Sequence, residues 1–152
     1  METNNKQQNN TEFESYVLYT SRVTKVVKGG KRLKFQALVV VGNRKNKVGL
    51  GFAKGVDPKS AIEKATRKAK KNLKHVVVRG TTVPYDVMSK FKSARIFVKP
   101  AKPGTGLIAS KSIRPVLELG GIQDVYSKVY GTKNKIANAY CIFNIITNFK
   151  SK

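Results

Sequence analysis

The sequence has one cysteine, one histidine and no tryptophan, and only eight of its residues are acidic. With Cys141 alone, no disulfide can form within the chain, which is typical of proteins from reducing compartments. Cys141 and His75 are too few to supply the ligands of a metal site. The acidic residues show no paired-carboxylate or triad pattern, so we predict that the protein is not an enzyme and binds no cofactor or metal.

Long apolar runs are also absent, and none reaches the roughly 18 residues that a transmembrane helix requires. Residues 1–12 are polar, lack the apolar core of a secretory signal, and are expected to form a disordered tail of an intracellular protein. An anionic membrane surface would require a basic helix with large apolar anchors. The basic helix expected near residues 58–73 carries mainly alanine on its apolar side, so we expect no membrane partner.

Positive charge is what the sequence has in excess. Thirty-one lysine and arginine residues oppose eight acidic residues, which gives a formal net charge of +23 over 152 residues. Such a surplus destabilises a compact chain by self-repulsion, and a polyanion relieves it because phosphate contacts release condensed counterions. Since 40% of the residues are hydrophobic, the chain can also form a core, and the composition indicates a folded nucleic-acid-binding protein.

The first half of the sequence predicts a small module of three antiparallel strands and one helix. Residues 16–27, 33–41 and 48–52 are rich in β-branched and aromatic side chains, and Gly29-Gly30 predicts a hairpin with a primed turn. The later half of the second strand is apolar on both faces. Gly49 and Gly51 leave one face of the third strand without side chains, which permits a close backbone approach.

A basic helix follows the three strands. Asp57 and Pro58 form a typical helix start, and apolar residues recur at helical spacing as far as Leu73. We place His75 at the end of this helix. The opposite face of the helix carries seven cations: Lys59, Lys64, Arg67, Lys68, Lys70, Lys71 and Lys74.

The second half predicts another α+β domain, in which the strands carry two helices on one face. Cys141 lies on an apolar stripe of the last helix, so we expect a buried, inert thiol. We divide the chain into a tail at 1–12, an N-terminal domain at 13–78 and a C-terminal domain at 79–152. The elements of the last domain are strands at 83–91, 95–99 and 125–130, a loop at 102–106, and helices at 113–119 and 134–149.

Two glycine-rich segments invite a nucleotide-binding interpretation and fail it. In residues 49–55 the third glycine is one position late and the segment belongs to an antiparallel module. In residues 104–112 the position before Lys111 is Ser110, whereas a phosphate-binding loop requires glycine there. We therefore favour ordinary connecting segments, and a degenerate kinase is the weakest alternative.

The basic clusters are the strongest candidates for a binding site. Cations on both strands surround the Gly29-Gly30 turn, so the hairpin could bring its backbone close to phosphate, while the alternative is a solvated strand edge that prevents aggregation. Of the aromatic residues considered for base stacking, we expect most to lie in the core: Phe13, Tyr16, Tyr19, Tyr85 and Phe91. The predicted RNA-binding residues are Arg22, Lys25, Lys28, Gly29, Gly30, Lys31, Arg32, Arg44, Lys45, Lys47, Lys54, Arg67, Lys68 and Lys71.

A set of segments carries a family resemblance across nearly all of residues 13–148. They are RVTKVVKGGKR at 22–32, FQALVVVG at 35–42, KVGLGFAKG at 47–55, KPA at 99–101, GTGLIA at 104–109, RPVLELGGI at 114–122 and YGT at 130–132. In this order and spacing the sequence resembles the bacterial-type small-subunit ribosomal protein S five family.

The resemblance implies a fold similar to a double-stranded-RNA-binding domain near residues 13–76, followed by an α+β domain without catalytic role. It implies a structural constituent of the small ribosomal subunit that binds ribosomal RNA and contributes to assembly and translational accuracy. The expected partners are small-subunit ribosomal RNA, the neighbouring proteins S four and S eight, and messenger RNA where it enters the subunit, with no homo-oligomer. The resemblance assigns a protein interface to Pro103, Gly104, Thr105, Gly106 and Arg114.

The implied location is the cytoplasmic ribosome, with an organellar ribosome as the alternative. A rival hypothesis is a free-standing double-stranded-RNA-binding protein or RNA chaperone, which would bind arbitrary duplexes tightly without other ribosomal proteins. The enzymatic rival predicts ATP turnover that depends on Lys111 or Thr105. Co-sedimentation with small subunits distinguishes the ribosomal hypothesis from both.

Overall fold

The computed structural model describes residues 13–150, which form a two-domain α+β protein with three helices, as predicted. Each of its two sheets has four strands, one more than the sequence analysis predicted for either domain. Within these residues no helix is long and apolar enough to cross a membrane. The elements are β1 (Glu14–Val27), β2 (Gly30–Gly42), β3 (Lys47–Gly55), α1 (Pro58–Lys71), β4 (Leu73–His75), β5 (Val87–Phe91), β6 (Ala94–Pro100), β7 (Leu107–Ile108), α2 (Arg114–Leu119), β8 (Val125–Tyr130) and α3 (Lys135–Asn148).

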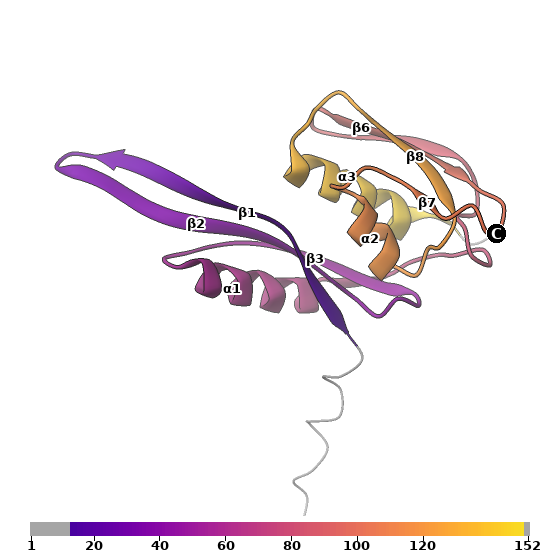
Figure 1. Cartoon of the computed structure of the whole chain (residues 1–152), viewed down its shortest axis with the longest axis horizontal. Coiled ribbons are helices and arrows are strands. Elements are labelled where there is room, and N and C mark those ends of the chain that lie inside the picture. Colours follow the sequence, from indigo (N-terminus) through magenta and orange to yellow (C-terminus); the bar gives the residue numbers. More distant parts are fainter. Residues whose placement is uncertain (1–12, 151–152) are drawn as a thin grey trace, which may run out of the picture.

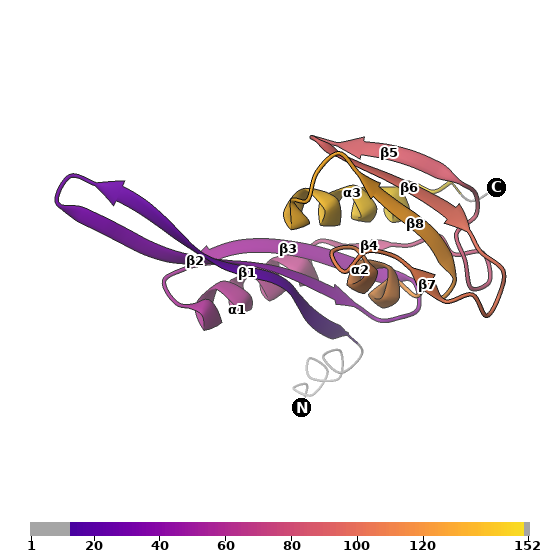
Figure 2. The same cartoon turned by 45° about the horizontal axis from the view of Figure 1, so that its top comes forward.

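The elements are stacked in four layers. Helix α1 covers one face of the sheet β1-β2-β3-β4, and helices α2 and α3 lie against its other face (Figures 1 and 2). The second sheet, β5-β6-β8-β7, lies on the far side of α2 and α3. No helix within residues 13–150 covers the outer face of that second sheet, in agreement with the predicted arrangement of two helices on one face.

The contact between α1 and the first sheet is made by small residues. Ala61, Ala65 and Ala69 of α1 are fully buried against the odd-numbered side chains of β2. A Cβ added at Gly49 would strike the carbonyl oxygen of Ala69, and one at Gly51 would strike that of Ala65. The predicted close approach is thus confirmed, because the helix backbone occupies the space that side chains would need.

The end of the basic helix differs from the prediction. Helix α1 ends at Lys71, and residues 73–75 form a fourth strand, β4, which pairs with the start of β3. His75 is therefore a strand residue opposite Lys47, where its Nε2 lies 3.3 Å from the Asn46 side-chain nitrogen. Helical spacing continues to Leu73 because that side chain packs under Gly49, although its backbone is extended.

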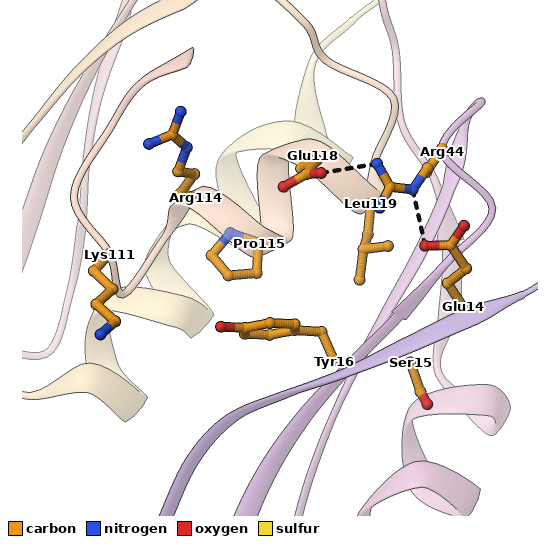
Figure 3. A pocket seen from close by; sticks show the side chains of 9 residues that line it. All are labelled: Glu14, Ser15, Tyr16, Arg44, Lys111, Arg114, Pro115, Glu118 and Leu119. Atoms are coloured by element: carbon orange, nitrogen blue, oxygen red, sulfur yellow. Dashed lines mark hydrogen bonds and ion pairs between the residues drawn. The ribbon is translucent and has the colours of Figure 1, made fainter.

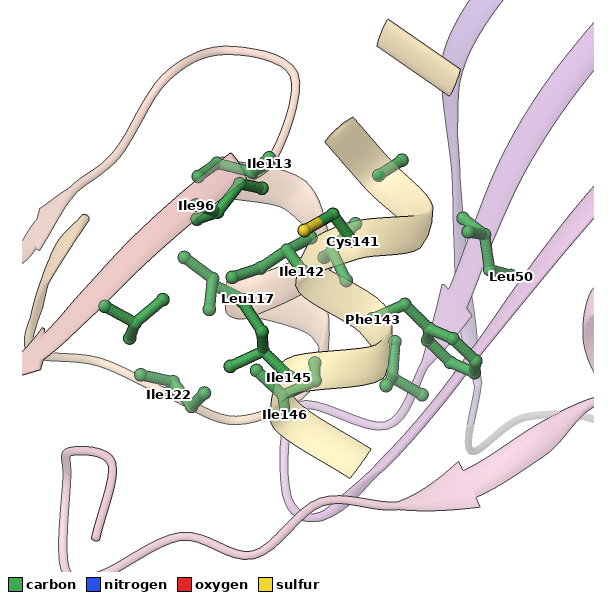
Figure 4. Packing of buried hydrophobic residues seen from close by; sticks show 14 of the residues in the cluster. Leu50, Ile96, Ile113, Leu117, Ile122, Cys141, Ile142, Phe143, Ile145 and Ile146 are labelled. Atoms are coloured by element: carbon green, nitrogen blue, oxygen red, sulfur yellow. The ribbon is translucent and has the colours of Figure 1, made fainter. Parts of the chain in front are cut away.

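The second face of the first sheet belongs to a core shared by both domains. Leu38, Val40, Val48 and Leu50 are almost completely buried in one cluster with side chains of α2 and α3 such as Phe143 (Figure 4). Each such side chain contributes roughly 1.5–3 kcal/mol when fully buried. Residues 38–41 are apolar on both faces because α1 covers one face of the sheet and α2 and α3 cover the other. The predicted domain boundary after residue 78 stays a prediction.

The second sheet contains one strand that the sequence analysis missed. The two-residue strand β7 pairs parallel to β8, and α2 connects the two, whereas β5-β6-β8 is antiparallel. Strand β5 begins at Val87 rather than residue 83, because the backbone bends at Pro84 and Tyr85, and Val83 before the bend is buried in the core. The thiol of Cys141 on α3 is also buried, and that burial raises its pKa, as expected of an inert cysteine.

Candidate nucleic-acid interface

The β1–β2 hairpin extends well beyond the rest of the first sheet. Strand β3 stops pairing with β2 at Phe35, opposite Gly55, but β1 and β2 continue through five more pairs, from Val23 opposite Lys34 to Val27 opposite Gly30. At about 3.3 Å per residue these pairs span roughly 15 Å. We call residues 22–34 the basic arm, and it projects from the body in Figures 1 and 2.

The turn at the tip is different from the predicted one. Because Val27 pairs with Gly30, the two turn residues are Lys28 and Gly29, not the two glycines. Gly29 has φ +109°, while Arg44 and Lys92 are the only non-glycine residues with positive φ in the described part of the chain. Both kinds of primed turn require positive φ at the first turn residue, and Lys28 does not have it. The turn is therefore not primed, and it needs glycine only at its second position, Gly29.

Charges of the basic arm are arranged unfavourably for an isolated hairpin. Lys25 lies directly opposite Arg32, and like charges in such a pair destabilise a sheet. Alternation along the strands puts Arg22 and Lys31 on one face of the arm and Lys25, Arg32 and Lys34 on the other. A two-stranded hairpin is itself only marginally stable in water. The arm therefore gains most from a partner that carries negative charge.

Apolar side chains of the arm are exposed together with these cations. Val26 is 74% exposed and Leu33 is 50% exposed, and among the described residues no third strand pairs with this part of the hairpin. Both lie on the face that carries Lys31. This face of the arm therefore offers a partner both apolar and cationic contacts.

A second basic surface lies between α1 and β3. A groove of about 260 Å³ is lined by two residues of β3 and four cations of α1, and we call it the α1–β3 groove. All of its charged lining residues are cations, and Lys68 donates a hydrogen bond of 3.3 Å to the Phe52 carbonyl. The lining residues are Ala53, Lys54, Lys64, Arg67, Lys68 and Lys71.

The structure separates three predicted RNA-binding residues from the others. Arg44 and Lys45 lie in the β2–β3 turn and Lys47 begins β3, all at the opposite end of β2 from the basic arm. Lys45 and Lys47 are exposed there, but the guanidinium of Arg44 is 2.9 Å from Glu14 and 2.8 Å from Glu118. These two carboxylates raise the pKa of Arg44, so its charge is already balanced within the chain.

Arg44 lines a pocket of about 290 Å³ between the start of β1 and helix α2. Tyr16 and Pro115 form its apolar part, while Lys111 and Arg114 stand at its rim without the paired carboxylates that Arg44 has (Figure 3). Arg114 also lines a second hollow with Leu107, the residue that follows Gly106. The structure thus brings Arg114 near the loop at 103–106, as a shared protein interface requires.

The loop at 103–106 is held by a carboxylate that the sequence analysis did not single out. Asp124, 4% exposed, accepts a hydrogen bond of 2.8 Å from the backbone N–H of Gly106. This bond, helped by the Thr81 hydroxyl, lowers the pKa of Asp124 below its ordinary value. Gly104 and Gly106 both have positive φ, and Pro103 and Gly104 are exposed, so the loop is fixed in shape and open to a partner.

The aromatic residues considered for stacking divide as expected. Phe13, Tyr19 and Phe91 are partly buried and pack against the cores, whereas Tyr16 and Tyr85 are exposed. Tyr85 also makes an edge-on contact with Phe149 at 5.0 Å. Exposed rings on the second sheet were missed, because their orientation depends on strand register.

Comparison with known proteins decides the family. Residues 13–77 match the family model described as ribosomal protein S5, N-terminal domain, and residues 89–152 match ribosomal protein S5, C-terminal domain. The chain belongs to the ribosomal protein S5 family. It is 50% identical over 124 residues to small ribosomal subunit protein uS5 of Dehalococcoides mccartyi strain CBDB1, covering 82% of this chain and 72% of the relative. The uS5 protein of D. mccartyi strain 195 is 49% identical over 124 residues, and the match again covers 82% of this chain and 72% of the relative.

Membership of the S5 family confirms the central prediction. The chain is a structural constituent of the small ribosomal subunit, binds ribosomal RNA as part of a ribonucleoprotein, and functions in translation. It is not an enzyme, which excludes the kinase hypothesis. Because it is a constituent of the small subunit, the hypothesis of a free-standing RNA-binding protein is also set aside. The assignment of individual residues to RNA or protein contacts stays a prediction.

Proposed function

We propose that this S5 protein binds small-subunit ribosomal RNA through the basic arm and the α1–β3 groove. The observation that carries the proposal is the arm, which places Lys25 opposite Arg32 on two strands without a third. Phosphates between such cations would remove their repulsion and supply contacts that the hairpin lacks on its own. Ribosomal RNA would then both bind the arm and stabilise its structure.

The groove would serve as a second phosphate site on the same domain. Lys54 of β3 and the α1 residues Lys64, Arg67, Lys68 and Lys71 could neutralise a stretch of RNA backbone without reading bases. Lys45 and Lys47, at the far end of β2, would add a separate contact. We leave Arg44 out of the binding mechanism because its guanidinium already pairs with Glu14 and Glu118.

Charge reversal tests the two surfaces separately. The variants are K28E/K31E in the arm and K64E/R67E in the groove, with K133E/K150E as a control of equal charge change at exposed lysines. Binding to small-subunit ribosomal RNA is measured over a range of salt concentrations. For either test variant we expect weaker binding and a salt slope lower by about one unit per lost contact.

The control variant separates local contacts from net charge. If K133E/K150E weakens binding as much as both test variants, the attraction is non-specific and the proposed surfaces are wrong. An unchanged salt slope in K28E/K31E would likewise mean that the arm tip faces solvent.

We further propose that the loop at 103–106 and Arg114 form the contact with the neighbouring protein S four. The fixed loop, the exposed Arg114 and the adjacent hollows support this assignment. Charge reversal in R114E should alter translational accuracy in a misreading reporter while leaving binding to naked ribosomal RNA unchanged. A normal error rate in ribosomes that contain R114E would contradict the assignment.

The remaining parts of the proposal concern location and neighbours. We propose that the protein acts in the cytoplasmic ribosome, contributes to subunit assembly, contacts S eight, and lies beside messenger RNA where it enters the subunit. Cross-linking of the protein within purified subunits would test these contacts directly. Cross-links to distant proteins alone would contradict them.

A further inference from the structure

The outer face of the second sheet alternates aromatic and cationic side chains. In β6, Ala94, Ile96 and Val98 are fully buried, so Arg95, Phe97 and Lys99 point to the other side. Register then assigns their neighbours on β8 to this same face. Tyr130 lies opposite Arg95, Lys128 opposite Phe97, and Tyr126 opposite Lys99.

The edge strands extend this face on both sides. On β5, Met88 lies opposite Phe97 and Lys90 opposite Arg95, while on β7 Ile108 lies beside Tyr126. The exposed fractions are 59% for Met88, 42% for Tyr126, 47% for Tyr130 and 50% for Ile108. We call the set the aromatic–cation face: Met88, Lys90, Arg95, Phe97, Lys99, Ile108, Tyr126, Lys128 and Tyr130.

No other part of the described chain covers this face. Helices α2 and α3 pack on the opposite side of the sheet, between it and the first sheet (Figures 1 and 2). The basic arm and the α1–β3 groove belong to the other domain. The aromatic–cation face is therefore a separate surface, and the proposed function above does not use it.

Four cations on this face have no carboxylate partner in the part of the chain that the structure describes. Both ion pairs within residues 13–150 are made by Arg44, so Lys90, Arg95, Lys99 and Lys128 have none. Asp86 and Asp124 flank the strands in sequence, but the Asp124 carboxylate is committed to Gly106. The face is thus positively charged as well as aromatic.

We propose that the aromatic–cation face binds unpaired RNA, with bases stacked on Phe97, Tyr126 and Tyr130 and phosphates held by the cations between them. Opposite residues on neighbouring strands have Cβ atoms about 5 Å apart, so each ring has a cation within reach of the phosphate next to a stacked base. Single-stranded nucleic acid satisfies both groups, because its base faces are free. A duplex hides its base faces, and an acidic protein segment would use the cations but not the rings.

The test compares the full chain with the variant F97L/Y126L/Y130L, which keeps every charge and removes the three rings. The probes are a short labelled oligouridylate and an RNA duplex of the same length. We expect the variant to bind the oligouridylate about tenfold more weakly or worse, since stacks are lost. Duplex affinity and the salt slope should stay unchanged, because the phosphate contacts remain.

A matched control is Tyr16→Leu, which removes an equally exposed ring from β1. This variant should bind both probes as the parent chain does. Equal loss of both probes in the triple variant, or no loss of either, would overturn the proposal. An acidic protein segment would use the cations without the rings, so unchanged oligouridylate binding in the triple variant would favour such a partner over unpaired RNA.

A second measurement does not depend on the folding of the variant. The unaltered chain is cross-linked by light to oligouridylate that contains thiouridine, and the attached peptides are identified. We expect attachment within β6 or β8. Attachment confined to the basic arm and the α1–β3 groove would overturn the proposal.

Discussion

The guanidinium of Arg44 lies 2.8 Å from the carboxylate of Glu118, 74 positions later in the chain. It connects the β2–β3 turn of the first sheet to helix α2, and the backbone N–H of Arg44 also donates to the Leu119 carbonyl at 3.0 Å. A cation that sequence alone groups with RNA contacts is thus part of the junction between the two domains.

Replacement of Arg44 by asparagine should affect the junction rather than RNA binding. Asparagine accepts the positive φ of 55° at this position but removes both ion pairs. Because the pairs are exposed, we expect Tm to fall by no more than about 4 °C. Affinity for ribosomal RNA should change far less than in K28E/K31E, and a comparable loss would show that Arg44 does contact RNA.

Replacement of Gly51 by alanine should strongly destabilise the N-terminal domain. The added Cβ would collide with the Ala65 carbonyl oxygen, and backbone cannot move aside as a flexible side chain can. We expect a loss of about 2 kcal/mol or more in the free energy of unfolding, measured by denaturant titration. Thr20→Ala, at an exposed position of β1, serves as the control, and equal stabilities would mean that α1 does not approach β3 so closely.

Replacement of Gly29 by valine should weaken RNA binding without unfolding the body. The position has φ +109° and open space around it, so the cost comes from backbone strain in the turn, about 1–2 kcal/mol for an ordinary residue. RNA affinity should fall by up to about tenfold, while Tm stays nearly unchanged because the tip is not part of either core. Gly29→Asn should lose less, and identical losses would argue against a conformational cause.

Acid should destabilise the loop at 103–106 through Asp124. The folded state lowers the pKa of this carboxyl below its ordinary value of 3.8, so its stabilising contribution is present above that value. The contribution is lost as pH falls from there through the lower pKa of the folded state. We expect Asp124→Asn to reduce the difference in Tm between neutral and acidic solution, whereas Asp86→Asn, an exposed control, should not. Identical pH profiles would contradict this role.

Sequence patterns predicted most of the local structure for identifiable reasons. Asp57 and Pro58 marked the start of α1, and β8 has the bounds that its alternation indicated. Sequence patterns gave the wrong structure where the pairing of strands decided the backbone conformation. Leu73 keeps helical spacing but lies in β4, and the tip turn is set by the pairing of Val27 with Gly30 rather than by the two adjacent glycines.

The candidate site shows the same division. Surplus charge indicated a nucleic-acid-binding protein, and the family resemblance specified RNA. The sequence did not show which cations lie together in the folded protein. Lys64 joins Lys54 only because α1 packs antiparallel to β3 over glycine and alanine. Asp124 gave no signal as an isolated acid, since its role depends on a backbone N–H 18 positions earlier.

The sequence by itself determined composition, charge, the family and the order of all helices and strands except β4 and β7, because these features depend on which residues follow one another. Tertiary structure decided which face of each strand meets water, which cations stand together and which are neutralised. Phe97, Tyr126 and Tyr130 illustrate the reason, because a shift of register by one residue would turn each of these rings into the core.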